Sequence, residues 1–126
     1  MIFLRDDEVL LVHHRQIDQF GGIHGLRDSG LLSSAIAAAE NRFHYEAASL
    51  STCAATYAYH LTQAHAFVDG NKRVGAAVAE VFVLMNGATL AASNEELIVV
   101  FLRIAAGEMS REEVEQWYEA RVKANF

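Results

Sequence analysis

Residues 65–87 read HAFVDGNKRVGAAVAEVFVLMNG, and this stretch decides the fold. Its second half is apolar on nearly every side, with Gly75 and Glu80 as the interruptions. A helix that lacks a polar face is buried at the centre of a domain. We therefore predict a central apolar helix that starts near Lys72 and ends at Asn86-Gly87, a pair suited to a left-handed cap.

Helical spacing of apolar residues continues on both sides of this stretch, and we expect no strands. Asp6 and Asp7 suit the start of a first helix over residues 6–20, and Gly21-Gly22 ends it. The remaining expected helices span residues 31–43 and 47–64, follow the capping box at 93–96 as far as Gly107, and follow the capping box at 110–113. The sequence thus predicts an all-α fold: a compact bundle of about six helices around the central one.

Composition indicates one domain over residues 1–126. Hydrophobic residues make up 52% of the chain, which provides a core without disulfides, and no proline, linker or repeat divides it. Sixteen acidic residues against 10 basic ones give a net charge of -6. That balance disfavours a general nucleic-acid binder, which needs clustered Lys and Arg.

Targeting signals are not evident. The first residues, MIFLRDDEVLLV, are acidic where a secretory signal is basic, and no apolar run reaches membrane-spanning length. Cys53 is the single cysteine and lies in an Ala-rich apolar stretch, so we expect a buried, inert thiol. These features favour a cytoplasmic protein with neither membrane nor nucleic acid as a partner.

The turn at residues 65–73 contains more chemistry than a helix–helix connection needs. Backbone N–H groups at the start of the following helix favour an anion, and Gly70 lets the backbone approach a ligand closely. Lys72 and Arg73 add two positive charges at the same place. This combination predicts a phosphate-binding site.

Two further residues suggest catalysis on a bound nucleotide. Asp69 is a hard oxygen ligand suited to an Mg²⁺ ion that also binds phosphates. His65 carries an imidazole, which can accept a proton from a hydroxyl near neutral pH. Phe67 is interpreted as a structural anchor that holds the turn on the core. The spacing of the glycines differs from that of a Walker A loop.

This turn resembles the Fic motif, His-x-Phe-x-Asp/Glu-Gly-Asn-Gly/Lys-Arg, at every defined position. Residues 21–36, GGIHGLRDSGLLSSAI, and residues 107–117, GEMSREEVEQW, are similar to death-on-curing (Doc) proteins, so the resemblance covers nearly the whole chain. It implies the all-α Fic fold of the Fic/Doc superfamily.

The resemblance also implies a role for each motif residue. His65 would remove the proton from a target hydroxyl, and Asp69 would bind Mg²⁺. Gly70 and Asn71 would form an anion hole, and Arg73 would contact the phosphates. Phe67 matches the buried motif Phe.

Two departures from AMP-transferring Fic enzymes are Doc-like: Lys72 stands where those enzymes have Gly, and Ala76 replaces their second Arg. A Doc-type protein binds ATP in the reversed sense and transfers the γ-phosphate, as a kinase. The implied substrate is a threonine of elongation factor Tu, whose phosphorylation arrests translation. The usual motif Pro is Ala66, which carries no reacting group.

The loop over residues 21–30 resembles the segment that positions the target peptide. Arg27 and Asp28 there either contact the substrate or cap the second helix. Fic proteins that inhibit themselves have Ser/Thr-x-x-x-Glu-Gly/Asn, but Glu40-Asn41 follows Ile36 here. The resemblance therefore implies inhibition in trans by a Phd-type antitoxin.

Three alternatives remain open. The first is an AMP transferase, which Lys72 disfavours because its side chain would crowd the α-phosphate position. The second is a catalytically silent Fic-fold protein that binds a nucleotide or a partner, which the intact His65 and Asp69 disfavour. The third is a helical domain whose turn has no chemical role.

Overall fold

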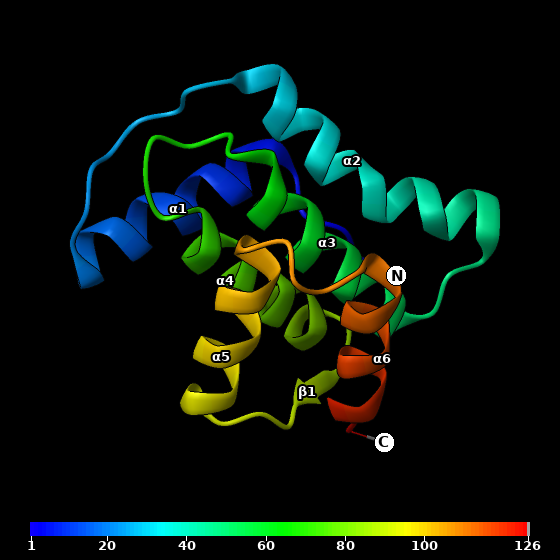
Figure 1. Cartoon of the computed structure of the whole chain (residues 1–126). Helices are drawn as coiled ribbons and strands as arrows, with labels where there is room; N and C mark the ends of the chain where they lie inside the picture. Colours follow the sequence, from blue (N-terminus) through cyan, green and yellow to red (C-terminus); the bar gives the residue numbers. More distant parts are fainter. Residues whose placement is uncertain (126) are drawn as a thin grey trace.

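The structure is a computed structural model that describes residues 1–125. Within this part of the chain it consists of six helices and two short strands (Figure 1). These elements are α1 (Asp6–Phe20), α2 (Ser29–Glu46), α3 (Leu50–Ala64), α4 (Asn71–Met85), β1 (Ala88–Leu90), α5 (Asn94–Ala105), α6 (Arg111–Arg121) and β2 (Val122–Ala124). The all-α class and the bundle of six helices are confirmed. No helix among residues 1–125 has the length and apolar character to cross a membrane.

The centre of the bundle is the pair α3 and α4. As expected, α4 is central, and it packs against α1, α3, α5 and β1. Helix α3 shares this position, because it contacts α2 on one side and α5 and α6 on the other (Figure 1). The two helices approach closely at Gly75, where a Cβ atom would lie 3.2 Å from the Ala58 carbonyl oxygen and closer still to Thr62 Oγ1. Glycine is therefore the residue that permits this crossing.

Cys53 lies inside α3 and is fully buried. Burial raises the pKa of its thiol to about 11, because the thiolate would have to exist without water. The thiol is therefore protonated at neutral pH, and the expected burial is confirmed.

Local signals fix several helix ends as expected. Helix α1 spans the predicted residues 6–20 and ends at Gly21, whose φ is 86°. Both predicted capping boxes form: Glu96 donates its N–H to Ser93 Oγ at 3.1 Å, and Glu113 does the same to Ser110 Oγ at 3.1 Å.

Helix α2 extends beyond the predicted 31–43 at both ends, and α3 begins later than the predicted residue 47. Asp28 caps α2 at its start, and Ala47 ends it in the left-handed conformation with φ 51°. Ser49 then caps α3 by accepting the N–H of Thr52 at 3.2 Å. The expectation for α3 was wrong because Ala47 belongs to the end of the preceding helix.

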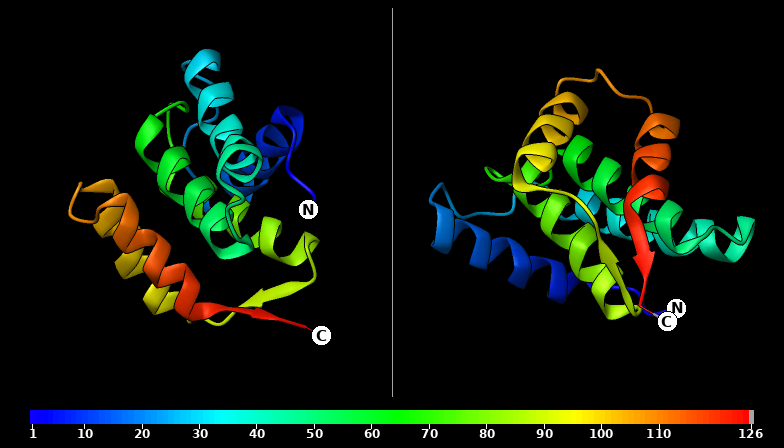
Figure 2. Two further views of the ribbon diagram at one scale, coloured as in Figure 1. Left: turned by 90° about the vertical axis from the view of Figure 1, so that its right-hand side faces the viewer. Right: turned by 90° about the horizontal axis from the view of Figure 1, so that it is seen from below.

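The expectation of no strands was also wrong, although the sheet is small. Strand β1 pairs antiparallel with β2, with Thr89 opposite Lys123, and the N–H of Asn125 donates to the Gly87 carbonyl at 3.1 Å. The Asn86 side chain binds the backbone of Ile2. Both ends of the described chain therefore lie beside the end of α4 (Figure 2).

Candidate active site

The turn between α3 and α4 is closed by its own side chains. His65 ends α3 with φ 50°, and Gly70 precedes α4 with φ 78°. Between them, Asn71 Oδ1 accepts the N–H of Phe67 at 3.1 Å, and Asn71 Nδ2 donates to the Phe67 carbonyl at 3.0 Å. The Asn71 side chain thus shapes the turn, and one amide hydrogen remains for another acceptor.

A polar cavity of about 420 Å³ opens at the start of α4. Its lining comes from the ends of α3 and α5, the turn and the first residues of α4: Thr62, His65, Val68, Asp69, Gly70, Asn71, Lys72, Arg73 and Ala105. Every residue predicted for catalysis, metal binding or phosphate binding lines this one cavity. Phe67 does not line it and is instead buried, as an anchor should be.

The Asp69 carboxylate is held in place by two backbone groups. Ile23 donates its N–H to Oδ2 at 3.0 Å, and Gly70 donates its N–H to Oδ1 at 2.8 Å. These hydrogen bonds, helped by the charge of Arg73, lower the pKa of Asp69 below its usual value. The carboxylate is ionised at neutral pH and retains lone pairs for a further ligand.

The loop that follows α1 lies directly against the motif. Arg73 donates a hydrogen bond to the carbonyl of Gly21 at 2.6 Å. A Cβ atom on Gly22 would lie 2.7 Å from Asp69 Oδ2 and 2.9 Å from the Arg73 guanidinium, and the φ of Gly22 is 122°. Gly22 therefore leaves room for the loop to approach the carboxylate and the guanidinium together.

Arg27 and Asp28, the two residues predicted from the substrate loop, make different contacts in the structure. Asp28 caps α2 by accepting the N–H of Leu31 at 2.9 Å, as the capping interpretation requires. Arg27 does not cap the helix, because its guanidinium donates to the carbonyl of His65, with Nε 3.0 Å away. Arg27 thereby fixes the backbone of the candidate base, whose imidazole is exposed at the cavity.

Lys72 is exposed, and no hydrogen bond or ion pair within residues 1–125 engages its ammonium group. It lines the polar cavity and also a neighbouring cavity of about 340 Å³. That second cavity is mostly apolar, and its lining is Lys72, Arg73, Ala76, Leu97, Ile98, Phe101 and Leu102. Lys72 therefore stands at the boundary between a polar and an apolar space.

Two residues of the site were not predicted from the sequence. His13 on α1 donates from Nε2 to the Asp69 carbonyl at 2.7 Å, and burial lowers its pKa, so the imidazole is neutral. Thr62 is fully buried at the cavity, and its hydroxyl has no hydrogen-bond partner in the described chain. A signal existed for His13, because a histidine on the apolar side of a helix needs a polar partner.

Comparison with known proteins identifies the family of the chain. The chain matches the model of the Fic/DOC family over residues 3–83, which is more than half of its length. The chain therefore belongs to the Fic/DOC family. It is also 30% identical over 111 residues to the protein kinase doc of Escherichia phage P1, and the match covers 87% of each chain.

Proposed function

We propose that this chain is an ATP-dependent protein Ser/Thr kinase of Doc type, a toxin that transfers the γ-phosphate of ATP to a threonine hydroxyl of a protein. One observation carries the proposal: His65, Asp69, Lys72 and Arg73 line the same cavity at the start of a helix. Phosphoryl transfer depends mainly on positioning and on electrostatic stabilisation, and these residue types supply both. The name of the phage relative supports the same class of reaction.

In the proposed reaction, His65 acts as the general base. It accepts the proton of the target hydroxyl while that oxygen forms a bond to the γ-phosphorus. The bond from the γ-phosphorus to the bridging oxygen breaks, and ADP leaves. The Arg27 contact with the His65 carbonyl supports this role, because it holds the end of α3 in one position.

Three positive features of the cavity suit a triphosphate. The first N–H groups of α4 lack partners within the helix, and the residues that carry them line the cavity. Arg73 uses part of its guanidinium on the Gly21 carbonyl and keeps other N–H groups for phosphate oxygens. Lys72 adds an exposed ammonium group at the cavity edge.

Asp69 is the residue that would hold Mg²⁺. Its carboxylate is ionised, hard and fixed by two backbone N–H groups, which fits one position of an oxygen-ligated ion. When bound, Mg²⁺ would neutralise negative charge on the phosphates.

The proposed target is elongation factor Tu, the substrate of the Doc proteins that this chain resembles, and the site of action would be the cytoplasm. To test both the reaction and the target, the purified chain is incubated with purified elongation factor Tu and ATP labelled at either the α- or the γ-position. We expect label from the γ-position alone, on a threonine, and none with His65→Ala. Transfer of the α-label would instead support the AMP transferase, and transfer of neither label would support a silent nucleotide-binding protein.

Lys72 provides the sharpest distinction between the two transferases. A four-carbon side chain at this position fills space beside the helix start and brings a compact charge to the terminal phosphates. We expect Lys72→Gly to lose phosphoryl transfer and to gain some AMP transfer, whereas Lys72→Arg should keep part of the phosphoryl transfer. Mass spectrometry of the target distinguishes one phosphoryl group from one AMP group. Phosphoryl transfer at the wild-type rate by Lys72→Gly would remove this role from the lysine.

A toxin needs an inhibitor, and we propose a Phd-type antitoxin acting in trans. The apolar cavity lined by Leu97, Ile98, Phe101 and Leu102 supports this, because an amphipathic helix that folds on binding needs such a surface. The chain alone should arrest growth, and coexpression with an adjacent small reading frame should restore it. Harmless expression of the soluble, folded chain in a host with a suitable elongation factor would contradict the toxin function.

A further inference from the structure

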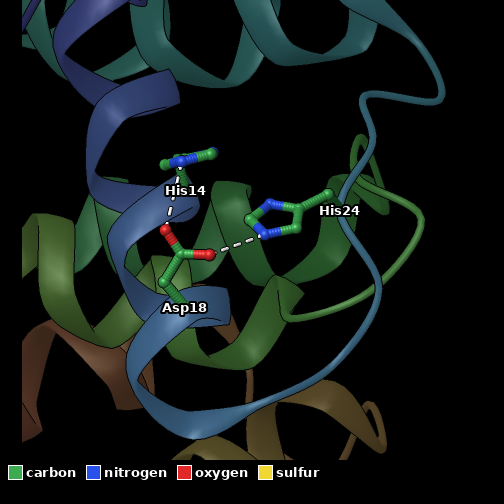
Figure 3. A group of neighbouring side chains, drawn as sticks. All are labelled: His14, Asp18 and His24. Carbon is green, nitrogen blue, oxygen red and sulfur yellow. Dashed lines mark hydrogen bonds and ion pairs between the residues drawn. The ribbon is translucent and has the colours of Figure 1, made fainter.

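Three side chains of the types that ligate metals lie together outside the polar cavity, near the end of α1 (Figure 3). His14 and Asp18 are one turn apart on the exposed face of α1, with His14 Nε2 3.1 Å from Asp18 Oδ2. His24 comes from the following loop and places Nε2 2.8 Å from Asp18 Oδ1. The carboxylate therefore lies between two imidazole nitrogens that belong to different segments.

The distances suit a small transition-metal ion. One ligand atom from each residue lies within 4.8 Å of the other two. Bonds of about 2.0–2.2 Å to a tetrahedral Zn²⁺ separate its ligand atoms by roughly 3.3–3.6 Å, so small side-chain shifts admit the ion. All three side chains are exposed, which leaves the fourth position to water.

We propose that His14, Asp18 and His24 form a Zn²⁺ site. Two imidazoles and one carboxylate favour zinc and similar transition metals, whereas Mg²⁺ prefers an all-oxygen set. The site is thus distinct in chemistry from the Asp69 position. It does not depend on the function proposed above.

Zinc at this position would fasten the loop that borders the polar cavity. His24 lies between Ile23, which donates its N–H to Asp69 Oδ2, and Gly25, whose carbonyl accepts the N–H of Val68 at 3.0 Å. A metal bond from His24 to α1 therefore restrains the loop between its two contacts with the motif. The ion orders the backbone that holds the Asp69 carboxylate.

The test is a calorimetric titration of the untagged chain with ZnCl₂. We expect one equivalent to bind to the wild type, and His24→Gln and Asp18→Asn each to weaken binding by at least about tenfold, since each removes a ligand. His44→Gln is the matched control. His44 pairs with Glu40 one helical turn away at 3.7 Å, is exposed, and belongs to no three-residue group in the described chain, so its loss should leave zinc binding unchanged.

Two further measurements address geometry and the loop. Co²⁺ in place of Zn²⁺ should give the visible absorption of a four-coordinate nitrogen and oxygen site, absent in His24→Gln, with circular dichroism confirming that each variant is folded. Zinc should slow amide hydrogen exchange over residues 21–25 in the wild type only. Absence of zinc binding, or equal binding by His24→Gln, would overturn the site. Specific binding without slower exchange would overturn its effect on the loop.

Discussion

The imidazole of His13 lies flat against the ring of Phe67, with their centroids 3.7 Å apart and their planes 10° apart. Its Nε2 donates to the carbonyl of Asp69, 2.7 Å away. One buried side chain of α1 therefore positions both the structural anchor and the candidate metal ligand.

Titration of His13 should make stability depend on pH. Burial lowers the pKa of folded His13 below its ordinary value of 6.5, so the unfolded chain binds the proton more readily. The contribution of His13 to the free energy of unfolding is therefore fully present above about pH 6.5, and it is lost as the pH decreases toward the pKa of folded His13. His13→Gln keeps an N–H donor but cannot titrate, and we expect a smaller loss of unfolding free energy in urea between about pH 7 and pH 5.

His60 is half-buried, and partial burial lowers its pKa too, so part of the decline should persist in His13→Gln. The lowered pKa of Asp69 acts in a separate window, because its contribution is lost only as the pH falls below about 4. Identical pH profiles for wild type and His13→Gln would show that His13 does not contribute.

Replacement of His65 should abolish transfer while the fold persists. The loss of a general base costs about 10²–10⁴ in rate, and an exposed side chain of this kind changes stability by about 0.5 kcal/mol or less. His65→Asn accompanies His65→Ala, because Asn tolerates the left-handed backbone found here, with φ 50°. The rate of γ-phosphate transfer and the affinity for ATP are measured for both variants. Transfer by His65→Asn at the wild-type rate would refute the assignment of His65 as the base.

Asp69→Asn should weaken Mg²⁺-dependent ATP binding, because the metal loses a charged ligand. Calorimetry with and without Mg²⁺ measures this effect. The change should also loosen the loop at Ile23, since an amide offers one oxygen where the carboxylate accepts two N–H groups. Glu80→Gln, on an exposed part of α4, serves as the control. The metal role would be excluded if Asp69→Asn retained the metal dependence of the wild type.

The crossing of α3 and α4 gives a prediction about stability. Gly75→Ala adds a methyl group where Thr62 already stands, and overpacking of this kind costs about 1–3 kcal/mol. Thr62→Ala removes a buried hydroxyl that has no partner in the described chain, so the double variant should recover much of the loss. Urea denaturation of the four proteins forms a double-mutant cycle. Simple additivity would mean that the two residues do not compete for space.

Local chemistry explains what the sequence could predict. The bounds of α1 and both capping boxes depend on neighbouring residues, and the motif from His65 to Arg73 is continuous, so one turn brings its parts together. Two local features could not be predicted. Alanine disfavours the left-handed conformation that Ala47 adopts, and a strand of three residues is too short to show an alternating pattern.

Contacts between distant segments could not be predicted from the sequence pattern. His13 and Asp69 are 56 positions apart, and Arg27 and His65 are 38 apart. Only the packing of α1 and its loop on the turn creates these pairs. For Arg27 the sequence left substrate contact and helix capping open, and the structure shows a bond to the His65 carbonyl instead of a cap, whereas its neighbour Asp28 does cap α2.

The position of the two chain ends suits the attachment of a label or a surface tether. Ile2 and Asn125 both bind the backbone or side chains at Asn86-Gly87, whereas the polar cavity lies at the opposite end of α4. Fifteen helical residues separate the two sites by about 22 Å. A fluorophore or a surface tether attached near residue 2 or residue 125 therefore leaves the cavity mouth facing solvent. Binding of a nucleotide or a large protein target can be followed on the immobilised chain.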